Sequence, residues 1–208
     1  MLKMMCIKIC GVTSVQDARF VVASGANALG LVFYPDSPRH VSIETAQAIV
    51  TDLPPFITSV GLFVDPEAAD VRAVLSAVPL SVLQFHGDES EAFCSQFGRP
   101  YLKAVRVRSQ QDILQALSNY PTAAALLLDA YDAKQKGGSG QTFDWRWIPQ
   151  KTSLPLVIAG GLTAENVGDL LAVTQPYAVD VCSGVEQSKG VKSRAKIEAF
   201  CQAVRSYG

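Results

Sequence analysis

Runs of apolar and β-branched residues alternate along the chain with segments whose apolar residues recur at helical spacing. The runs predict eight strands, at residues 6–10, 28–33, 57–64, 81–86, 101–107, 125–130, 155–159 and 178–182. The segments between and after them predict helices at residues 15–24, 43–53, 66–77, 89–97, 110–120, 163–172 and 193–206. Residues 145–150 fit neither pattern.

Polar residues that commonly cap helices stand at the start of several helical segments. The predicted caps are Thr13 or Ser14, Ser42, Asp65 and Thr163. Asp65 precedes Pro66, which favours the first helical position because proline lacks the N–H that a helix start leaves unpaired.

Eight strand–helix units in 208 residues give about 26 residues per unit, near the short limit for a (β/α)8 barrel. No linker rich in Pro, Gly or Ser divides the chain, so we predict one α/β domain over residues 1–208, a TIM barrel. The alternative is an open doubly wound sheet. That fold usually carries a GxGxxG fingerprint after its first strand, and residues 9–13 (ICGVT) do not match it.

Composition limits the partners. The chain is 49% hydrophobic and 18% charged, which excludes disorder for most of it, and 18 basic against 19 acidic side chains leave a net charge of -1. This balance provides no electrostatic surface for nucleic acid or an anionic membrane. Apolar stretches such as residues 123–128 are too short to span a bilayer, so we expect a soluble protein that binds its ligand in a local site.

The start of the chain and its cysteines indicate the compartment. Lys8 stands where a signal peptide would have its apolar region. The five cysteines (Cys6, Cys10, Cys94, Cys182 and Cys201) are scattered and include no CxxC pair, and the chain has two histidines. We therefore predict a cytoplasmic protein without a disulfide framework, a metal site or a cofactor signature.

Barrel enzymes carry their active sites at the carboxyl ends of the strands. The polar or reactive residues at the predicted strand ends are Cys10, His86, Asp129 and the triplet 182–184, and Arg39 lies in the proline-stiffened loop after the second strand. An arginine there can bind a carboxylate through two parallel hydrogen bonds, or it can be an ordinary exposed loop arginine.

Period-two alternation places Lys8 and Cys10 on one face of the first strand. The other face, with Ile7 and Ile9, must pack on helices, so Lys8 should point into the barrel, as should Asp180 on the last strand. These strands are neighbours in a closed barrel, and a buried charge needs a partner. We hypothesise a Lys8–Asp180 ion pair; the alternative is a solvated Lys8 at an end of the barrel.

Three glycine-rich stretches are candidates for phosphate binding. Gly160 and Gly161 follow the seventh strand, Ser183 and Gly184 follow the eighth, and Gly138 and Gly140 lie in the long loop after the sixth. Glycines let backbone N–H groups approach a dianion, and the loops after strands seven and eight commonly bind phosphate in barrels. Each stretch can also be a simple turn, but two on consecutive strands favour a phosphate-binding barrel.

Seven motifs together resemble the phosphoribosylanthranilate isomerase family of tryptophan biosynthesis. In chain order they are KICG at 8–11, FYPDSPR at 33–39, VLQFHG at 82–87, LLD at 127–129, GGSGQTFDW at 137–145, AGGL at 159–162 and DVCSGVE at 180–186. KICG and GGSGxxFDW are the specific ones, and the resemblance spans the whole chain.

The resemblance implies a cofactor-free isomerase. Its reaction is the Amadori rearrangement of N-(5-phosphoribosyl)anthranilate to 1-(2-carboxyphenylamino)-1-deoxyribulose 5-phosphate, the third step from chorismate to tryptophan. Ring opening produces an iminium that itself accepts the electrons released when the C2 proton leaves, so one acid and one base suffice.

By resemblance, Cys10 maps onto the general base and Asp129 onto the general acid. Taken alone, Cys10 can be a core cysteine and Asp129 a helix cap. The proposed roles require a cation near Cys10, for which Lys8 is the candidate, and an apolar setting for Asp129, which Leu127 and Leu128 are expected to supply.

The resemblance assigns the substrate's anthranilate carboxylate to Arg39 and its phosphate to Gly160, Gly161, Ser183 and Gly184, with residues 138–140 closing nearby. His86 is either a substrate contact or a structural histidine. Cys182 stands where the family pattern leads us to expect serine.

Two other readings remain. One is another phosphate-binding barrel enzyme, similar to indole-glycerol-phosphate synthase or a pentose-phosphate epimerase. The other is a barrel that binds a phosphorylated ligand without catalysis. We expect a small phosphorylated substrate as partner, and a monomer in preference to a homodimer.

Overall fold

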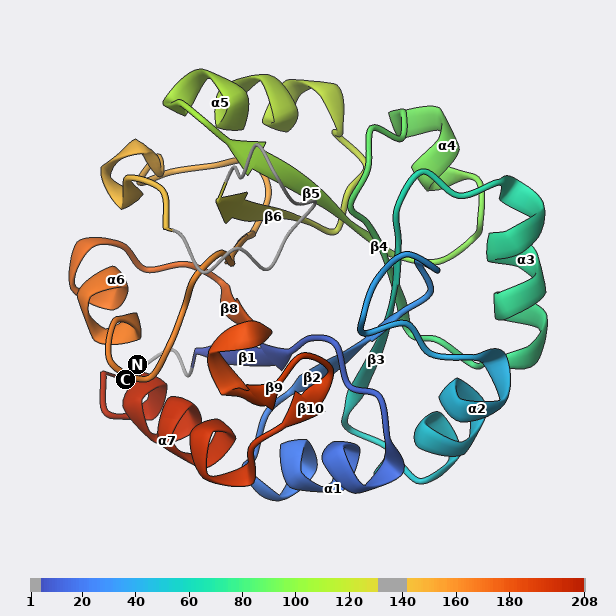
Figure 1. Cartoon of the computed structure of the whole chain (residues 1–208). Helices are drawn as coiled ribbons and strands as arrows, with labels where there is room; N and C mark the ends of the chain where they lie inside the picture. Colours follow the sequence, from blue (N-terminus) through green and yellow to red (C-terminus); the bar gives the residue numbers. More distant parts are fainter. Residues whose placement is uncertain (1–4, 131–141, 208) are drawn as a thin grey trace.

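The computed structural model describes residues 5–130 and 142–207. Eight parallel strands close into a barrel in sequence order, and β1 pairs with β8 to complete it (Figure 1). The strands are β1 Cys6–Ile9, β2 Ala28–Val32, β3 Thr58–Phe63, β4 Val82–Phe85, β5 Tyr101–Val107, β6 Ala125–Ala130, β7 Leu156–Ile158 and β8 Ala178–Val181. The predicted TIM barrel is thus confirmed, and each strand lies within one residue of its predicted bounds.

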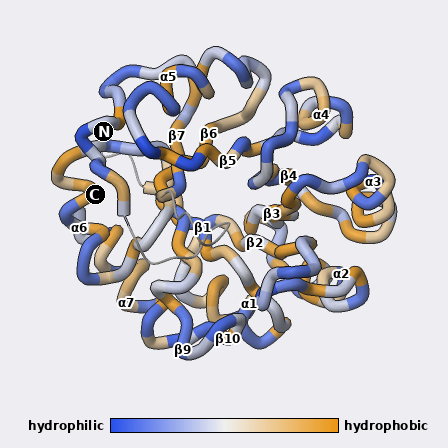
Figure 2. The backbone as a smooth tube through the Cα atoms, turned by 45° about the horizontal axis from the view of Figure 1, so that its top comes forward, coloured by the Kyte–Doolittle hydropathy of each residue, from blue (hydrophilic) through white to orange (hydrophobic). Residues whose placement is uncertain are grey.

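Helices surround the barrel on its outer side (Figure 1). They are α1 Val15–Ala23, α2 Ile43–Thr51, α3 Ala68–Ala77, α4 Glu91–Ser95, α5 Gln110–Asn119, α6 Val167–Val173 and α7 Arg194–Arg205. Figure 2 shows hydrophobic and hydrophilic segments alternating along these helices, as expected where one face packs on the strands and the other meets water. No helix within the described part of the chain has the length and apolar character needed to cross a membrane.

Alternation along the strands separates two cores. Outward-facing residues such as Ile7 and Ile9 pack against the helices in the larger core, whereas inward-facing residues such as Leu127 and Val157 form a small layer inside the barrel. Lys8 and Cys10 lie on the inner side and are buried, as the period-two pattern predicts.

Two predicted helix caps are confirmed and two are wrong. The Ser14 and Ser42 hydroxyls accept from the backbone N–H groups of Asp17 and Thr45. Helix α3 begins at Ala68 instead of residue 66, with Glu67 as its N-cap. Asp65 itself adopts a φ of 45°, and its backbone N–H donates to the carboxylate of Glu89, which lies after β4, instead of starting a helix.

The predicted cap Thr163 is displaced in a similar way. Its backbone N–H donates to Asn166 Oδ1 at 2.8 Å, and Asn166 is the N-cap of α6, which begins at Val167. The three residues before it form a turn that the helical spacing does not distinguish from a first helical turn.

Short elements complete the carboxyl end of the barrel. A 3₁₀ turn, η1 Trp145–Trp147, occupies the segment that the sequence left unassigned. After β8, a second 3₁₀ turn, η2 Ser183–Val185, leads into a hairpin of β9 Glu186–Ser188 and β10 Val191–Lys192. The sequence pattern did not predict this hairpin, since strands of two and three residues are too short to show alternation.

Candidate active site

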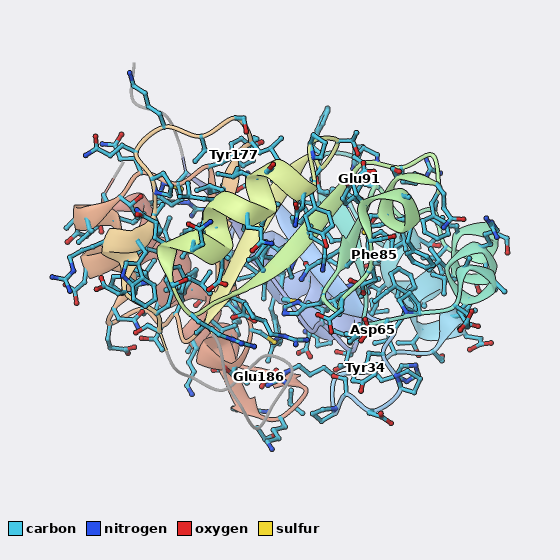
Figure 3. All side chains as sticks on the ribbon, turned by 90° about the horizontal axis from the view of Figure 1, so that it is seen from above. Tyr34, Asp65, Phe85, Glu91, Tyr177 and Glu186 are labelled. Carbon is cyan, nitrogen blue, oxygen red and sulfur yellow. The ribbon has the colours of Figure 1, made fainter. Side chains whose placement is uncertain are left out.

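A cavity of about 380 Å³ opens at the carboxyl ends of the strands. The predicted site residues that line it are Cys10, Arg39, His86, Asp129, Gly160, Gly161, Asp180 and Ser183. In Figure 3 this end is marked by Tyr34, Asp65 and Glu186, which follow β2, β3 and β8, and the opposite end by Tyr177, which precedes β8. A larger hollow of about 900 Å³ at the amino ends of β7 and β8 is lined by none of those predicted site residues that the structure describes.

One side of the cavity, here called the thiol wall, consists of Lys8, Cys10, Asp180 and Cys182 on β1 and β8 and at their ends. Lys8 lies opposite Asp180 in the strand register, and Lys8 Nζ is 2.8 Å from Asp180 Oδ1. The hypothesised ion pair is present, with both side chains at most 7% exposed. Lys8 is not among the residues that line the cavity; it lies two residues before Cys10 on the inner face of β1 and belongs to the thiol wall through its ion pair with Asp180.

Burial and charge act against each other in this pair. Burial raises the pKa of Asp180 to about 6, and the attraction of Lys8 only partly opposes it. Burial would lower the pKa of Lys8, but the charges of Asp180 and Cys10 outweigh it, and that pKa rises above its ordinary value. Lys8 is therefore a permanent cation of the thiol wall, and Asp180 is the partner that loses its charge first on acidification.

Cys10 directly follows β1 and is 5% exposed. A hydrogen bond from the Cys182 thiol holds the pKa of Cys10 well below its ordinary value, against the effect of burial, and the charges of Lys8 and Lys192 lower it further. The same hydrogen bond, together with burial, raises the pKa of Cys182. The pair therefore carries its negative charge on Cys10, with Cys182 as the donor.

The opposite side of the cavity, here called the histidine wall, consists of Gln84, His86 and Asp129. His86 Nε2 lies 3.1 Å from Asp129 Oδ2, and Gln84 Nε2 lies 3.1 Å from His86 Nδ1. The Ala130 N–H donates to Asp129 Oδ1 at 2.9 Å. The three side chains are buried and form one continuous line of hydrogen bonds.

The surroundings of Asp129 differ from the expected apolar pocket. Leu127 lies in the inner layer below the carboxyl group, but Leu128 points outward and packs in the core beneath the helices. The atoms that contact the carboxylate oxygens are the imidazole of His86 and the backbone N–H of Ala130. Hydrogen bonds, more than leucine side chains, therefore define the position of this carboxyl group.

Arg39 reaches the cavity from the loop after β2, but it is not free. Its Nε and Nη2 bind the two carboxylate oxygens of Glu186 at 2.7 and 2.8 Å, and these hydrogen bonds raise the pKa of Arg39. Glu186 also accepts from Lys192 Nζ at 3.0 Å. Within the described part of the chain, Glu186 thus fixes one edge of the guanidinium, and the Nη1 donors and one Nη2 donor remain for a ligand.

The glycine loops after β7 and β8 meet at the cavity. Gly160 has a φ of 86°, and a Cβ there would lie 2.5 Å from the Ala130 nitrogen, so both conformation and space require glycine. A Cβ on Gly184 would collide with the Leu162 carbonyl oxygen, so the two loops pack at a distance that only glycine permits. Gly184 is not among the residues that line the cavity, whereas its neighbour Ser183 is. Gly138 and Gly140 lie outside the described residues.

Sequence reasoning missed three residues at the site. Gln84 and Lys189 line the cavity, and Glu186 fixes Arg39. The sequence could have predicted Gln84, because this polar residue stands in the apolar strand VLQF on the same face as His86. Lys189 lies in the turn of the unpredicted hairpin, so no pattern placed it.

A closed parallel barrel with a thiol, a carboxyl group and two glycine loops at the carboxyl ends of its strands defines a (β/α)8-barrel enzyme of the phosphate-binding type. A family profile described as N-(5'phosphoribosyl)anthranilate (PRA) isomerase matches residues 7–203. The chain belongs to this isomerase family.

Relatives agree with this assignment over nearly the full length of the chain. The N-(5'-phosphoribosyl)anthranilate isomerase of Pseudomonas fluorescens is 54% identical over 198 residues, which cover 95% of this chain and 94% of the relative. The crystal structure of the Thermotoga maritima phosphoribosyl anthranilate isomerase has 40% identity and a TM-score of 0.90, covering 98% of this chain and 100% of that one.

A further solved structure carries a ligand. It is a phosphoribosyl anthranilate isomerase in complex with reduced 1-(o-carboxyphenylamino)-1-deoxyribulose 5-phosphate. It shares 37% identity and a TM-score of 0.84, over 98% of this chain and 100% of that one.

Proposed function

We propose that this chain rearranges N-(5'-phosphoribosyl)anthranilate to 1-(2-carboxyphenylamino)-1-deoxyribulose 5-phosphate with Cys10 as general base and Asp129 as general acid. The observation that carries the assignment is their placement: the thiol wall and the histidine wall line one cavity from different strands. A sugar bound between them meets an acid on one side and a base on the other.

The acid step opens the ring. Asp129, as a carboxylic acid, donates its proton to the furanose oxygen; the C1–O bond breaks, and the nitrogen lone pair forms a C1=N iminium. The Cys10 thiolate then removes the C2 proton, and the C–H electron pair forms the C1=C2 bond of an enolamine and neutralises the nitrogen. Tautomerisation of the enolamine gives the ketone. The iminium accepts the electrons, so the proposal requires no cofactor.

The electrostatics of each wall suit its role. A base that works near neutrality needs a lowered pKa, and the Cys182 hydrogen bond and the Lys8 charge both lower that of Cys10. Asp129 has hydrogen-bonding partners but no ion pair with a lysine or arginine among the described residues. The carboxyl group proposed as the acid therefore has an imidazole and a backbone N–H as its neighbours, and no fixed cation among these residues.

Two groups of donors suit the ends of the substrate. The free edge of Arg39 offers parallel N–H donors for the anthranilate carboxylate, with Glu186 holding the other edge in place. The backbone N–H groups of Gly160, Gly161, Ser183 and Gly184 are proposed to bind the phosphate. Asp180 and His86 line the cavity between these ends, where the ribose would lie.

The test is an assay that follows the loss of phosphoribosylanthranilate fluorescence on purified protein, with the substrate generated in the cuvette. We expect turnover that is unchanged by a chelator and restored growth without tryptophan in an isomerase-deficient strain. Absence of both turnover and growth would refute the proposed function. Turnover of a different phosphorylated sugar alone would indicate one of the rival barrel enzymes.

The proposal extends to the state of the protein. We infer that residues 1–208 act as one barrel domain, as a monomer in the cytoplasm. Light scattering after gel filtration should give a mass near 22.3 kDa. A mass of twice that value would identify a homodimer instead.

A further inference from the structure

The histidine wall contains two side chains that the proposed reaction does not use. Gln84 is completely buried and His86 is 9% exposed, and both face the inside of the barrel in front of Asp129. A glutamine in the interior of a strand needs partners for its amide, since a buried polar group without one is costly. Gln84 Nε2 lies 3.1 Å from His86 Nδ1, whereas the buried Gln84 Oε1 has no hydrogen-bond partner among the described residues.

The backbone around His86 is fixed from several sides. The His86 N–H donates to the Phe63 carbonyl at 2.9 Å, and Lys103 Nζ binds the Gly87 carbonyl at 2.6 Å. Glu89 accepts from the Gly87 N–H at 3.0 Å and pairs with Lys103 at 3.0 Å. The backbone of His86 is therefore fixed. When the hydrogen bonding of its neighbours changes, the imidazole can respond by a change of tautomer more readily than by a change of position.

The amide of Gln84 determines that tautomer. When its N–H donates to Nδ1, the imidazole proton must sit on Nε2, where it donates to an ionised Asp129. When the Gln84 amide turns by 180°, its Oε1 accepts a hydrogen bond from a protonated His86 Nδ1. His86 Nε2 then carries no proton and accepts a hydrogen bond from the carboxylic acid form of Asp129. Each protonation state of Asp129 thus has a matching arrangement of the same two side chains, and the second one gives Gln84 Oε1 a partner.

We propose that His86 is a positioning residue for Asp129, and that Gln84 sets its tautomer, so that the carboxyl group stays in one place as it gives up and regains its proton. The proposal rests on the function of Asp129 proposed above. It explains why an acid that must donate in one step is surrounded by hydrogen bonds instead of the apolar pocket that the sequence led us to expect.

Other charges face this wall and must be kept constant in any test. Arg106 on β5 donates from Nη2 to the His86 carbonyl at 3.3 Å. Asp180 on β8 lies close enough for its charge to interact with Asp129, and Lys8 and Cys10 on β1 complete the thiol wall opposite. Between the two walls, the residues after β7 that line the cavity are uncharged. Substitutions at Gln84 and His86 leave all of these groups in place.

The kinetic test compares three variants of His86. Removal of the imidazole in His86→Ala should lower kcat about ten- to hundredfold, leave KM within about twofold and shift the limb of the kcat–pH profile that reports Asp129. His86→Gln, whose amide reaches the position of Nε2, should recover most of the kcat and the original profile. The shorter His86→Asn should recover neither, and it is the matched control.

The second test reads the tautomer without any assay. The chain has two histidines, His40 and His86, so ¹⁵N-histidine labelling gives two sets of ring signals, and His86→Gln identifies the second. In the wild-type protein we expect the ring proton on Nε2, because the Gln84 amide nitrogen lies 3.1 Å from Nδ1. In Gln84→Glu, whose carboxylate can only accept, the proton should be on Nδ1; Gln84→Met, with no amide, should show a mixture.

The outcomes separate the two proposals. An unchanged His86 tautomer in Gln84→Glu, or a folded His86→Ala enzyme with wild-type kcat and pH profile, would overturn the positioning role. If His86→Ala does not fold, Gln84→Met provides the kinetic comparison, with a loss of several-fold in kcat expected. If the wild-type protein fails to isomerise phosphoribosylanthranilate, the proposed function falls, and the NMR result then shows whether the tautomer control exists without it.

Discussion

The two walls of the cavity differ in how they control a proton. The thiol wall uses full charges: a buried Lys8–Asp180 pair at 2.8 Å and a thiol hydrogen bond favour the anion of Cys10. The histidine wall uses dipoles: an amide, an imidazole and a backbone N–H surround Asp129. The contrast teaches that fixed charges can favour the anion that a base needs at the start of its step, whereas an acid that starts protonated is held by dipolar partners that can bond to both of its forms.

The largest expected effects come from removing the reactive group of either wall. Cys10→Ser and Asp129→Asn should each lower kcat by about two to four orders of magnitude with KM little changed, because the lost interaction exists only in the transition state. Steady-state kinetics on both purified variants checks this. Near-normal turnover of Cys10→Ser would remove Cys10 as the base, and free turnover of Asp129→Asn would leave the acid unidentified.

Loss of the Lys8 charge from the thiol wall should reduce the stability of the fold in a pH-dependent way. The pKa of Asp180 is raised to about 6 in the folded protein, so the stability it contributes is present below about pH 4 and is lost as pH rises through 6. Lys8→Met removes the attraction that opposes the rise of the Asp180 pKa. The loss of stability with rising pH should therefore become larger and occur at higher pH. At pH 8 we expect the free energy of unfolding to fall by about 3 kcal/mol.

Urea denaturation of Lys8→Met and of the parent at pH 4 and pH 8 measures this effect. At pH 4 Asp180 is protonated in the folded state, and the two proteins should differ little. An equal loss at both pH values would mean that Lys8 stabilises the barrel by packing and not by its charge.

A smaller effect is expected at the mouth of the cavity, where Arg39 belongs to neither wall. Arg39→Lys keeps the charge but removes the parallel donors, so KM should rise about tenfold with kcat little changed. The matched control is Arg19→Lys, an exposed arginine paired with Asp52 on the outer surface, which should leave KM unaltered. An unchanged KM in Arg39→Lys would exclude the carboxylate clamp.

Much of this structure is predictable from local pattern. The barrel follows from eight apolar runs, and the Lys8–Asp180 pair follows from strand alternation together with closure, which makes β1 and β8 neighbours. The wrong predictions arise where a residue that is distant in the sequence determines the local structure. The Glu89 carboxylate binds the Asp65 N–H and unwinds the predicted start of α3, and nothing local in the sequence of Asp65 and Pro66 reports that contact.

The site shows the same division. Residues at strand ends, such as Cys10 and His86, could be placed on the cavity from their position alone. Partners of these residues could not: Glu186 reaches Arg39 from a hairpin that lies 147 residues further along the chain and is too short to predict. Gln84 is an intermediate case, since its strand and face were predictable, but the direction of its amide depends on a tautomer that no sequence pattern encodes.

The reactivity of Cys10 tests the contrast between the walls most directly. The rate at which iodoacetamide alkylates Cys10, followed by peptide mass spectrometry from pH 5 to 10, reports its thiolate. The midpoint should lie well below the ordinary value of about 8.5, and it should rise in Lys8→Met and in Cys182→Ala but much less in Cys182→Ser, which keeps a hydrogen-bond donor. A wild-type midpoint at or above the ordinary value would contradict a charge-activated base at this wall.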